Sequence, residues 1–93
     1  MRLTESEITA IKQTIAALDV NAKVYLFGSR VDDTKRGGDI DLLIMSEHLS
    51  LEDRGKIRWR LWELIGEQKI DIIIAKDCSD PFVRIALNMG LPL

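Results

Sequence analysis

The 93-residue sequence has little of what several functional classes require. Its one cysteine, Cys78, excludes an internal disulfide and a cysteine-based zinc site, and its one histidine, His48, is likewise alone. The net charge of −2 provides no basic field for nucleic acid. No apolar run approaches the roughly 18 residues that span a bilayer, and the N-terminus carries acids where a signal peptide needs an apolar core. We expect a soluble cytoplasmic protein that binds neither nucleic acid directly nor a membrane.

The length suits a single domain over residues 1–93, with little room for a separate substrate-binding domain. Three stretches have helical character. Thr4 followed by Glu7 forms a capping box, which predicts a helix over residues 5–18. A second helix is predicted over residues 51–68, and Pro81 suits the first turn of a third over residues 81–89. The second helix has an apolar stripe made of Ile57, Leu61, Leu64 and Ile65.

Short apolar runs predict three strands, over residues 23–27, 39–45 and 69–75. The helix between the second and third strands is the usual crossover between parallel neighbours. The loop between the first two favours an antiparallel pairing. The end of the first strand and the starts of the other two should therefore share one sheet edge. The predicted fold class is α+β with α/β-like features, a small mixed sheet packed against helices.

Three acids are predicted at this edge: Asp39, Asp41 and Asp71. Asp39 and Asp41 are two residues apart on a strand, so their side chains point to the same face. Two such charges about 4 Å apart repel by about 4 kcal/mol at an effective dielectric near 20, so the cluster needs cations or protonation. Oxygen ligands without histidine or cysteine favour a hard ion such as Mg²⁺ or Mn²⁺.

Gly28 and Ser29 are predicted at the same edge, in the turn after the first strand. Glycine allows a sharp turn and a close approach to a ligand. Serine offers a hydroxyl and a backbone N–H, which suit the β- and γ-phosphates of a nucleoside triphosphate. The turn and the three acids together predict a metal-dependent phosphate site.

This pattern resembles the minimal nucleotidyltransferases, or MNT proteins, of the DNA polymerase β-like superfamily. Their signature is a Gly-Ser turn, a loop, an Asp-x-Asp strand and a later strand acid, and the resemblance runs through nearly the whole chain. It implies the nucleotidyltransferase fold and transfer of a nucleoside monophosphate with release of pyrophosphate. It also implies that Asp39 and Asp41 hold two divalent ions, and that Asp71 ligates the second ion and helps activate the attacking hydroxyl.

The resemblance further implies that Gly28 and Ser29 bind the triphosphate tail. The family often keeps a basic residue at the position of Arg30, which is therefore a candidate phosphate ligand, as are Lys35 and Arg36 in the loop. Many relatives have Ser or Thr just before the first acid, where this chain has Gly38, whose backbone N–H could serve instead.

Short MNT proteins are commonly encoded with a HEPN ribonuclease, as antitoxin and toxin. The resemblance implies that the chain adds AMP from ATP to a tyrosine of such a partner. Two alternatives remain: an antitoxin that acts by binding alone, and the catalytic subunit for a small acceptor such as an aminoglycoside. Trp59, opposite the apolar stripe of its helix, and the apolar tail over residues 82–93 are candidate surfaces for a homodimer or hetero-oligomer.

Overall fold

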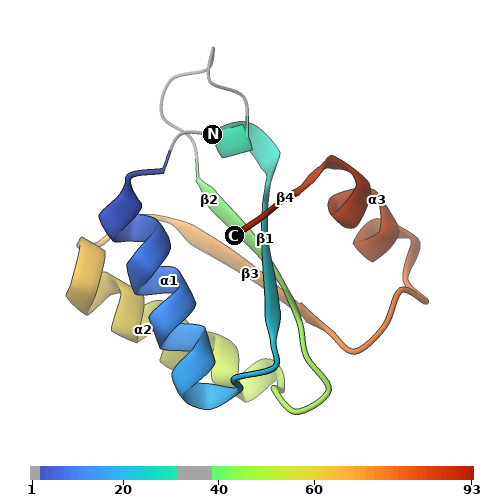
Figure 1. The fold of residues 1–93 in the computed structure, drawn as a ribbon, viewed down its shortest axis with the longest axis horizontal. Helices are drawn as coiled ribbons and strands as arrows, with labels where there is room; N and C mark the ends of the chain where they lie inside the picture. Colours follow the sequence, from blue (N-terminus) through green and yellow to red (C-terminus); the bar gives the residue numbers. More distant parts are fainter. Residues whose placement is uncertain (1–2, 32–38) are drawn as a thin grey trace.

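The computed structural model describes residues 3–31 and 39–93. In this part of the chain, four strands and three α-helices follow one another, with one short 3₁₀ helix, η1 (Figure 1). The elements are α1 (Glu5–Leu18), β1 (Lys23–Phe27), η1 (Gly28–Val31), β2 (Ile40–Met45), α2 (Leu51–Ile65), β3 (Ile70–Ala75), α3 (Pro81–Met89) and β4 (Leu91–Pro92). No helix of the described segments is long and apolar enough to cross a membrane.

The strands form one mixed sheet in the order β3-β2-β1-β4. β1 is antiparallel to both β2 and β4, whereas β2 and β3 are parallel. Helices α1 and α2 cover one face of the sheet, and α3 lies on the other (Figure 1). The α+β class and the predicted pairing of the first three strands are confirmed.

Local signals position the helices. The predicted capping box of α1 is present, because the Glu7 N–H donates to Thr4 Oγ1 at 3.1 Å and the Thr4 N–H donates to Glu7 Oε1 at 2.9 Å. Helix α3 has the predicted bounds, with the Asp80 carboxylate accepting a bond from the Phe82 N–H at 2.8 Å. These caps satisfy backbone donors that a helix N-terminus leaves unpaired.

Helix α2 is shorter than predicted, and its predicted apolar stripe is confirmed at Ile57, Leu61 and Ile65 but not at Leu64. It ends at Ile65, because Gly66 adopts φ 88°, a left-handed conformation that glycine tolerates. Ile57 and Leu61 are fully buried as predicted, but Leu64 is 45% exposed. Trp62 packs against the core instead, and its indole N–H donates to the Gln68 carbonyl at 2.8 Å. The last predicted turn is thus replaced by a loop that this indole anchors.

The C-terminal tail forms a strand that the sequence analysis did not predict. β4 pairs with Tyr25 and Leu26 of β1, and the Leu93 N–H donates to the Val24 carbonyl at 2.9 Å. A Cβ at Gly90 would lie 2.6 Å from the Ala86 carbonyl oxygen, so glycine is what allows the tight turn from α3 back to the sheet.

The tail was predicted to be an apolar surface almost all round, but α3 has two different faces. Val83 and Ala86 are buried against the sheet. The opposite face carries Phe82, Ile85 and Met89, each more than half exposed. Within the tail, this outer face of α3 stays a candidate interface.

A buried polar contact ties the end of α1 to the loop after β2. The Ser46 hydroxyl donates to the Asp19 carboxylate at 2.5 Å and accepts from the N–H groups of His48 and Leu49. This contact holds the pKa of Asp19 below its usual value. One serine hydroxyl therefore satisfies three partners at the sheet end remote from the acids.

We expect Ser46→Ala to lower the free energy of unfolding by about 1 to 3 kcal/mol, because it removes the donor to Asp19 Oδ2 and leaves the N–H groups of His48 and Leu49 without their acceptor. Urea denaturation at neutral pH measures this change. Ser79→Ala, at an exposed serine, is the control and should be nearly neutral. Equal stability of Ser46→Ala and wild type would show that the contact contributes nothing.

Candidate active site

The strand register brings two of the predicted acids face to face. In the parallel β2–β3 pair, Asp41 lies directly opposite Asp71. In the antiparallel β1–β2 pair, Asp41 lies opposite Phe27, the residue before the Gly28 turn. The end of β1 and the starts of β2 and β3 therefore meet at one sheet edge, as predicted.

Alternation along the strands decides which way these acids point. Ile40, Leu42 and Ile44 are fully buried in the core beneath α1 and α2. Asp41 consequently points to the other face of the sheet, the face of α3. It is half-buried there, whereas Asp71 is exposed. The pair thus has one shielded carboxyl and one open to solvent.

Asp39 lies one residue before β2 and has a partner that the sequence analysis missed. The Lys69 Nζ atom lies 3.3 Å from Asp39 Oδ2. The predicted strands began at Asp39 and Lys69, and the observed strands begin one residue later. A signal for this pair existed, because Lys69 precedes Asp71 by the same two residues that separate Asp39 from Asp41. In parallel strands, equal spacing puts Lys69 opposite Asp39.

The electrostatics of the cluster centre on Asp41. Burial is the main reason that the pKa of Asp41 is raised to about 6, and the charge of Asp71, a hydrogen bond with Asp71 and the charge of Asp39 add to the effect. Lys69 acts in the opposite direction. The Lys69 pKa is itself raised, first by its contact with Asp39. Below a pH of about 6, without a cation, Asp41 is therefore protonated and hydrogen-bonded to Asp71.

The Gly28 turn lies against the Asp41 carboxylate. Gly28 has φ 77°, and a Cβ at this position would lie 2.2 Å from Asp41 Oδ2. Any other residue would both strain the backbone and collide with the acid. Ser29 and Arg30 follow in η1, so the predicted phosphate-binding turn and the acids are neighbours.

Three further phosphate-binding candidates were predicted in the loop before β2. Gly38, Lys35 and Arg36 lie outside the described residues.

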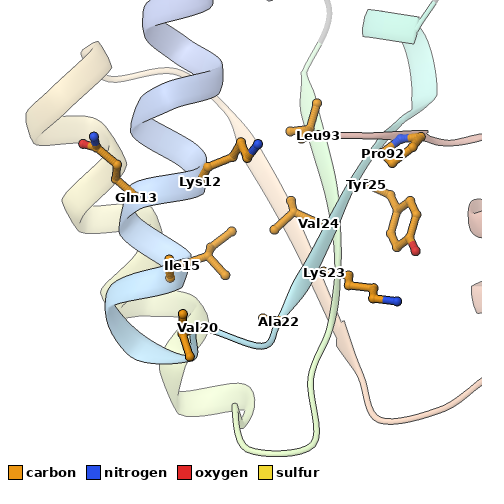
Figure 2. A pocket seen from close by; sticks show the side chains of 11 residues that line it. Lys12, Gln13, Ile15, Val20, Ala22, Lys23, Val24, Tyr25, Pro92 and Leu93 are labelled. Carbon is orange, nitrogen blue, oxygen red and sulfur yellow. The ribbon is translucent and has the colours of Figure 1, made fainter.

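A groove of about 630 Å³ lies between α1 and the sheet, where the side chains of Ile15 and Val24 line the space between helix and strand (Figure 2). Its lining includes Lys23 at the start of β1, the end of the strand farthest from Gly28, and none of the three acids lines it.

The comparisons with known proteins decide the family. The model of the family described as polymerase beta, nucleotidyltransferase matches residues 9–93. The chain belongs to this family. A comparison with curated proteins gives no match. The family match covers every strand of the sheet and supports nucleotidyl transfer as the general activity.

The carboxylate oxygens of Asp39, Asp41 and Asp71 in this nucleotidyltransferase are the kind of ligand that a hard divalent cation prefers. Within residues 3–31 and 39–93, no three His, Cys, Asp or Glu side chains stand grouped as a ready set of metal ligands. One physical reason is that the Asp39 carboxylate is paired with Lys69 and not grouped with Asp41 and Asp71. Yet the donors are all carboxylates, and the pKa of Asp41 is raised by burial first and then by the charges of Asp71 and Asp39, which a cation would offset.

Proposed function

We propose that this nucleotidyltransferase transfers AMP from ATP to a hydroxyl group of a partner protein. Mg²⁺, or Mn²⁺ in its place, would be held as two ions by Asp39, Asp41 and Asp71. The observation that carries the proposal is the register that sets Asp41 opposite Asp71, beside the Gly28 turn. A structural role alone does not account for a like-charged pair that raises a pKa.

The strand order supports a different task for each acid in the proposed reaction. β2 lies between β1 and β3, so Asp41 stands between the Gly28 turn on one side and Asp71 on the other. The turn, with Gly28, Ser29 and Arg30, would bind the triphosphate tail. Asp71, exposed on the far side, would face the acceptor and take the proton of its hydroxyl. Asp41 is thus central to both halves of the reaction.

The reaction balances with these parts. The acceptor oxygen bonds to the α-phosphorus, the bond from that phosphorus to the β-phosphate oxygen breaks, and pyrophosphate leaves. The divalent ions, when bound, supply charge stabilisation for the attacking and departing oxygens. The backbone of the Gly28 turn orients the tail, so that the α-phosphorus lies in line between the two oxygens.

For the acceptor, we propose a tyrosine of a HEPN-type ribonuclease, so that this nucleotidyltransferase acts as its antitoxin. The resemblance to MNT proteins is the main support. The position of α3 adds to it, because Phe82 contacts Phe27 edge to face, with ring centroids 6.1 Å apart, and Phe27 is the register partner of Asp41. A protein docked on the exposed face of α3 would lie beside the acids. Trp59, 66% exposed on α2, remains a second candidate contact.

The direct test mixes the purified chain, α-labelled ATP, Mg²⁺ and the product of the neighbouring gene. We expect label on that product with wild type and none with Asp39→Ala. Asp77→Ala, at an exposed acid remote from the sheet edge, is the control and should label normally. Absence of label with wild type, or equal label with Asp39→Ala, would refute the proposal.

A protection assay in cells, together with the labelling reaction, separates the two alternatives. If Asp41→Asn still binds the toxin and still protects cells, the chain neutralises by binding alone; the apolar outer face of α3 is the feature that favours this second function. If label appears on an aminoglycoside and on no protein, the acceptor is a small molecule. The proposed function predicts normal complex formation by Asp41→Asn with loss of protection.

A further inference from the structure

Lys69 occupies the fourth corner of an array whose other corners are the three acids. β2 and β3 are parallel, with Asp41 opposite Asp71, and just before the strands the Ile40 N–H donates to the Lys69 carbonyl at 3.0 Å. Side chains two residues apart on a strand share a face, so Lys69 lies on the face of Asp71. Across the two strands, Lys69 therefore lies opposite Asp39, and Asp71 lies opposite Asp41.

The contact between Lys69 and Asp39 is easily exchanged, although their backbones are fixed. Their side chains are 71% and 38% exposed, and ion pairs this open to solvent are weak. The backbone beside Lys69 is held from two sides, by the Ile40 N–H and by Arg58, whose Nε donates to the Ile70 carbonyl at 3.0 Å. Only the lysine side chain has to move for Asp39 to change partner.

We propose that Lys69 is a positioning residue that holds Asp39 until a divalent cation displaces it. This inference rests on the proposed function, because it takes Asp39 as a metal ligand. Lys69 and the ion compete for the same carboxylate, and their like charges repel.

The displaced ammonium stays on the acceptor side of the site. Gly28 follows β1 and Lys69 precedes β3, with β2 between them. Two strand spacings of about 4.8 Å separate these positions. The Lys69 backbone thus lies two strands away from the turn proposed to bind the triphosphate, with its ammonium at Asp39, and binding of ATP without metal should not depend on it.

The test is a titration of the full chain with Mn²⁺, followed by the electron paramagnetic resonance signal of free Mn²⁺. We expect Lys69→Met to bind Mn²⁺ about three- to tenfold more tightly than wild type, because the competing cation is gone. Lys69→Arg keeps the charge and should stay within about twofold of wild type. Lys76→Met, the matched control, removes a lysine just beyond the other end of β3 and should also stay within about twofold.

Two results would overturn the inference. The first is Mn²⁺ binding by Lys69→Met that is no tighter than that of wild type, while Asp41→Asn weakens binding; the metal site would then stand without the lysine's role. The second is weaker binding of ATP in EDTA by Lys69→Met, measured by calorimetry, which would make Lys69 a phosphate ligand. If wild type and Asp41→Asn both fail to bind Mn²⁺, the proposed function fails as well.

Discussion

Asp41→Asn is expected to reduce nucleotidyl transfer on the order of 10³-fold, the loss typical when one group that stabilises charge in an active site is removed. Asp41 is the acid between the Gly28 turn and Asp71, so no other described carboxylate can take its place. Transfer of label from α-labelled ATP to the acceptor measures the loss. Asp77→Asn is the matched control and should retain activity.

The same substitution is expected to stabilise the metal-free fold at neutral pH. Because the pKa of Asp41 is raised to about 6 from 3.8, folding favours the protonated carboxyl. Its stabilising contribution is full below pH 3.8 and is lost as the pH rises through 6. Asparagine resembles the protonated acid and has no such dependence. Wild type and Asp41→Asn should therefore be about equal near pH 4.

Above pH 7 in EDTA, Asp41→Asn should unfold with a free energy about 1 to 2 kcal/mol higher than wild type, after allowance for the half-buried position of the carboxyl. Urea denaturation at both pH values measures the difference. Saturating Mg²⁺ should reverse the order, because it stabilises only the chain that binds it. If Asp41→Asn is less stable than wild type in EDTA at neutral pH, the ionised Asp41 carboxylate does not destabilise the fold, and the raised pKa assigned to burial and to the charges of Asp71 and Asp39 is wrong.

Gly28→Ala is the second substitution with a large expected effect. The left-handed φ of 77° should make the variant less stable by about 1 to 2 kcal/mol. The new Cβ would also clash with Asp41 Oδ2, so the carboxylate must rotate away. A displacement of about 1 Å at reacting groups can reduce a rate by about 10²-fold. We expect a loss of that size in label transfer.

Gly55→Ala is the control for this substitution, with the opposite sign expected. Gly55 lies inside α2, and a Cβ there meets no atom within 4 Å. Alanine should raise the free energy of unfolding by about 0.5 to 1 kcal/mol and leave label transfer unchanged. If both substitutions affect activity alike, the effect of Gly28→Ala does not come from its contact with Asp41.

The strands and their pairing were predictable because each depends on a local pattern. Alternation around Asp41 gave the face of the carboxyl, and connection length gave the direction of β3 relative to β2. β4 was not predictable in this way, because two residues containing Pro92 have no strand pattern and pair only through contact with β1. The end of α2 was misplaced because Gln68 continues a polar face, while the stop depends on the conformation of Gly66.

The three acids of the candidate site were predicted from the sequence, but the contribution of Lys69 was not. Asp39, Asp41 and Asp71 stood out because carboxylates at strand starts are unusual, and the structure places Asp71 opposite Asp41. Lys69 did not stand out, since a lysine flanking a strand is commonplace. Its significance depends on which residue lies across from it, and that follows from register rather than from composition.

The pairing of Asp41 with Asp71 also bears on how this domain can change in evolution. Ile70 and Ile72, on either side of Asp71, are almost fully buried, and a slip of β3 by one residue would put a carboxylate into the core and two isoleucines into water. Residues can be inserted or deleted in the loops that flank α2, but the strand has to return to the same alignment. Burial of these two isoleucines in the core therefore fixes the register of β3 and keeps the two acids opposite each other, while the loops that flank α2 can vary in length.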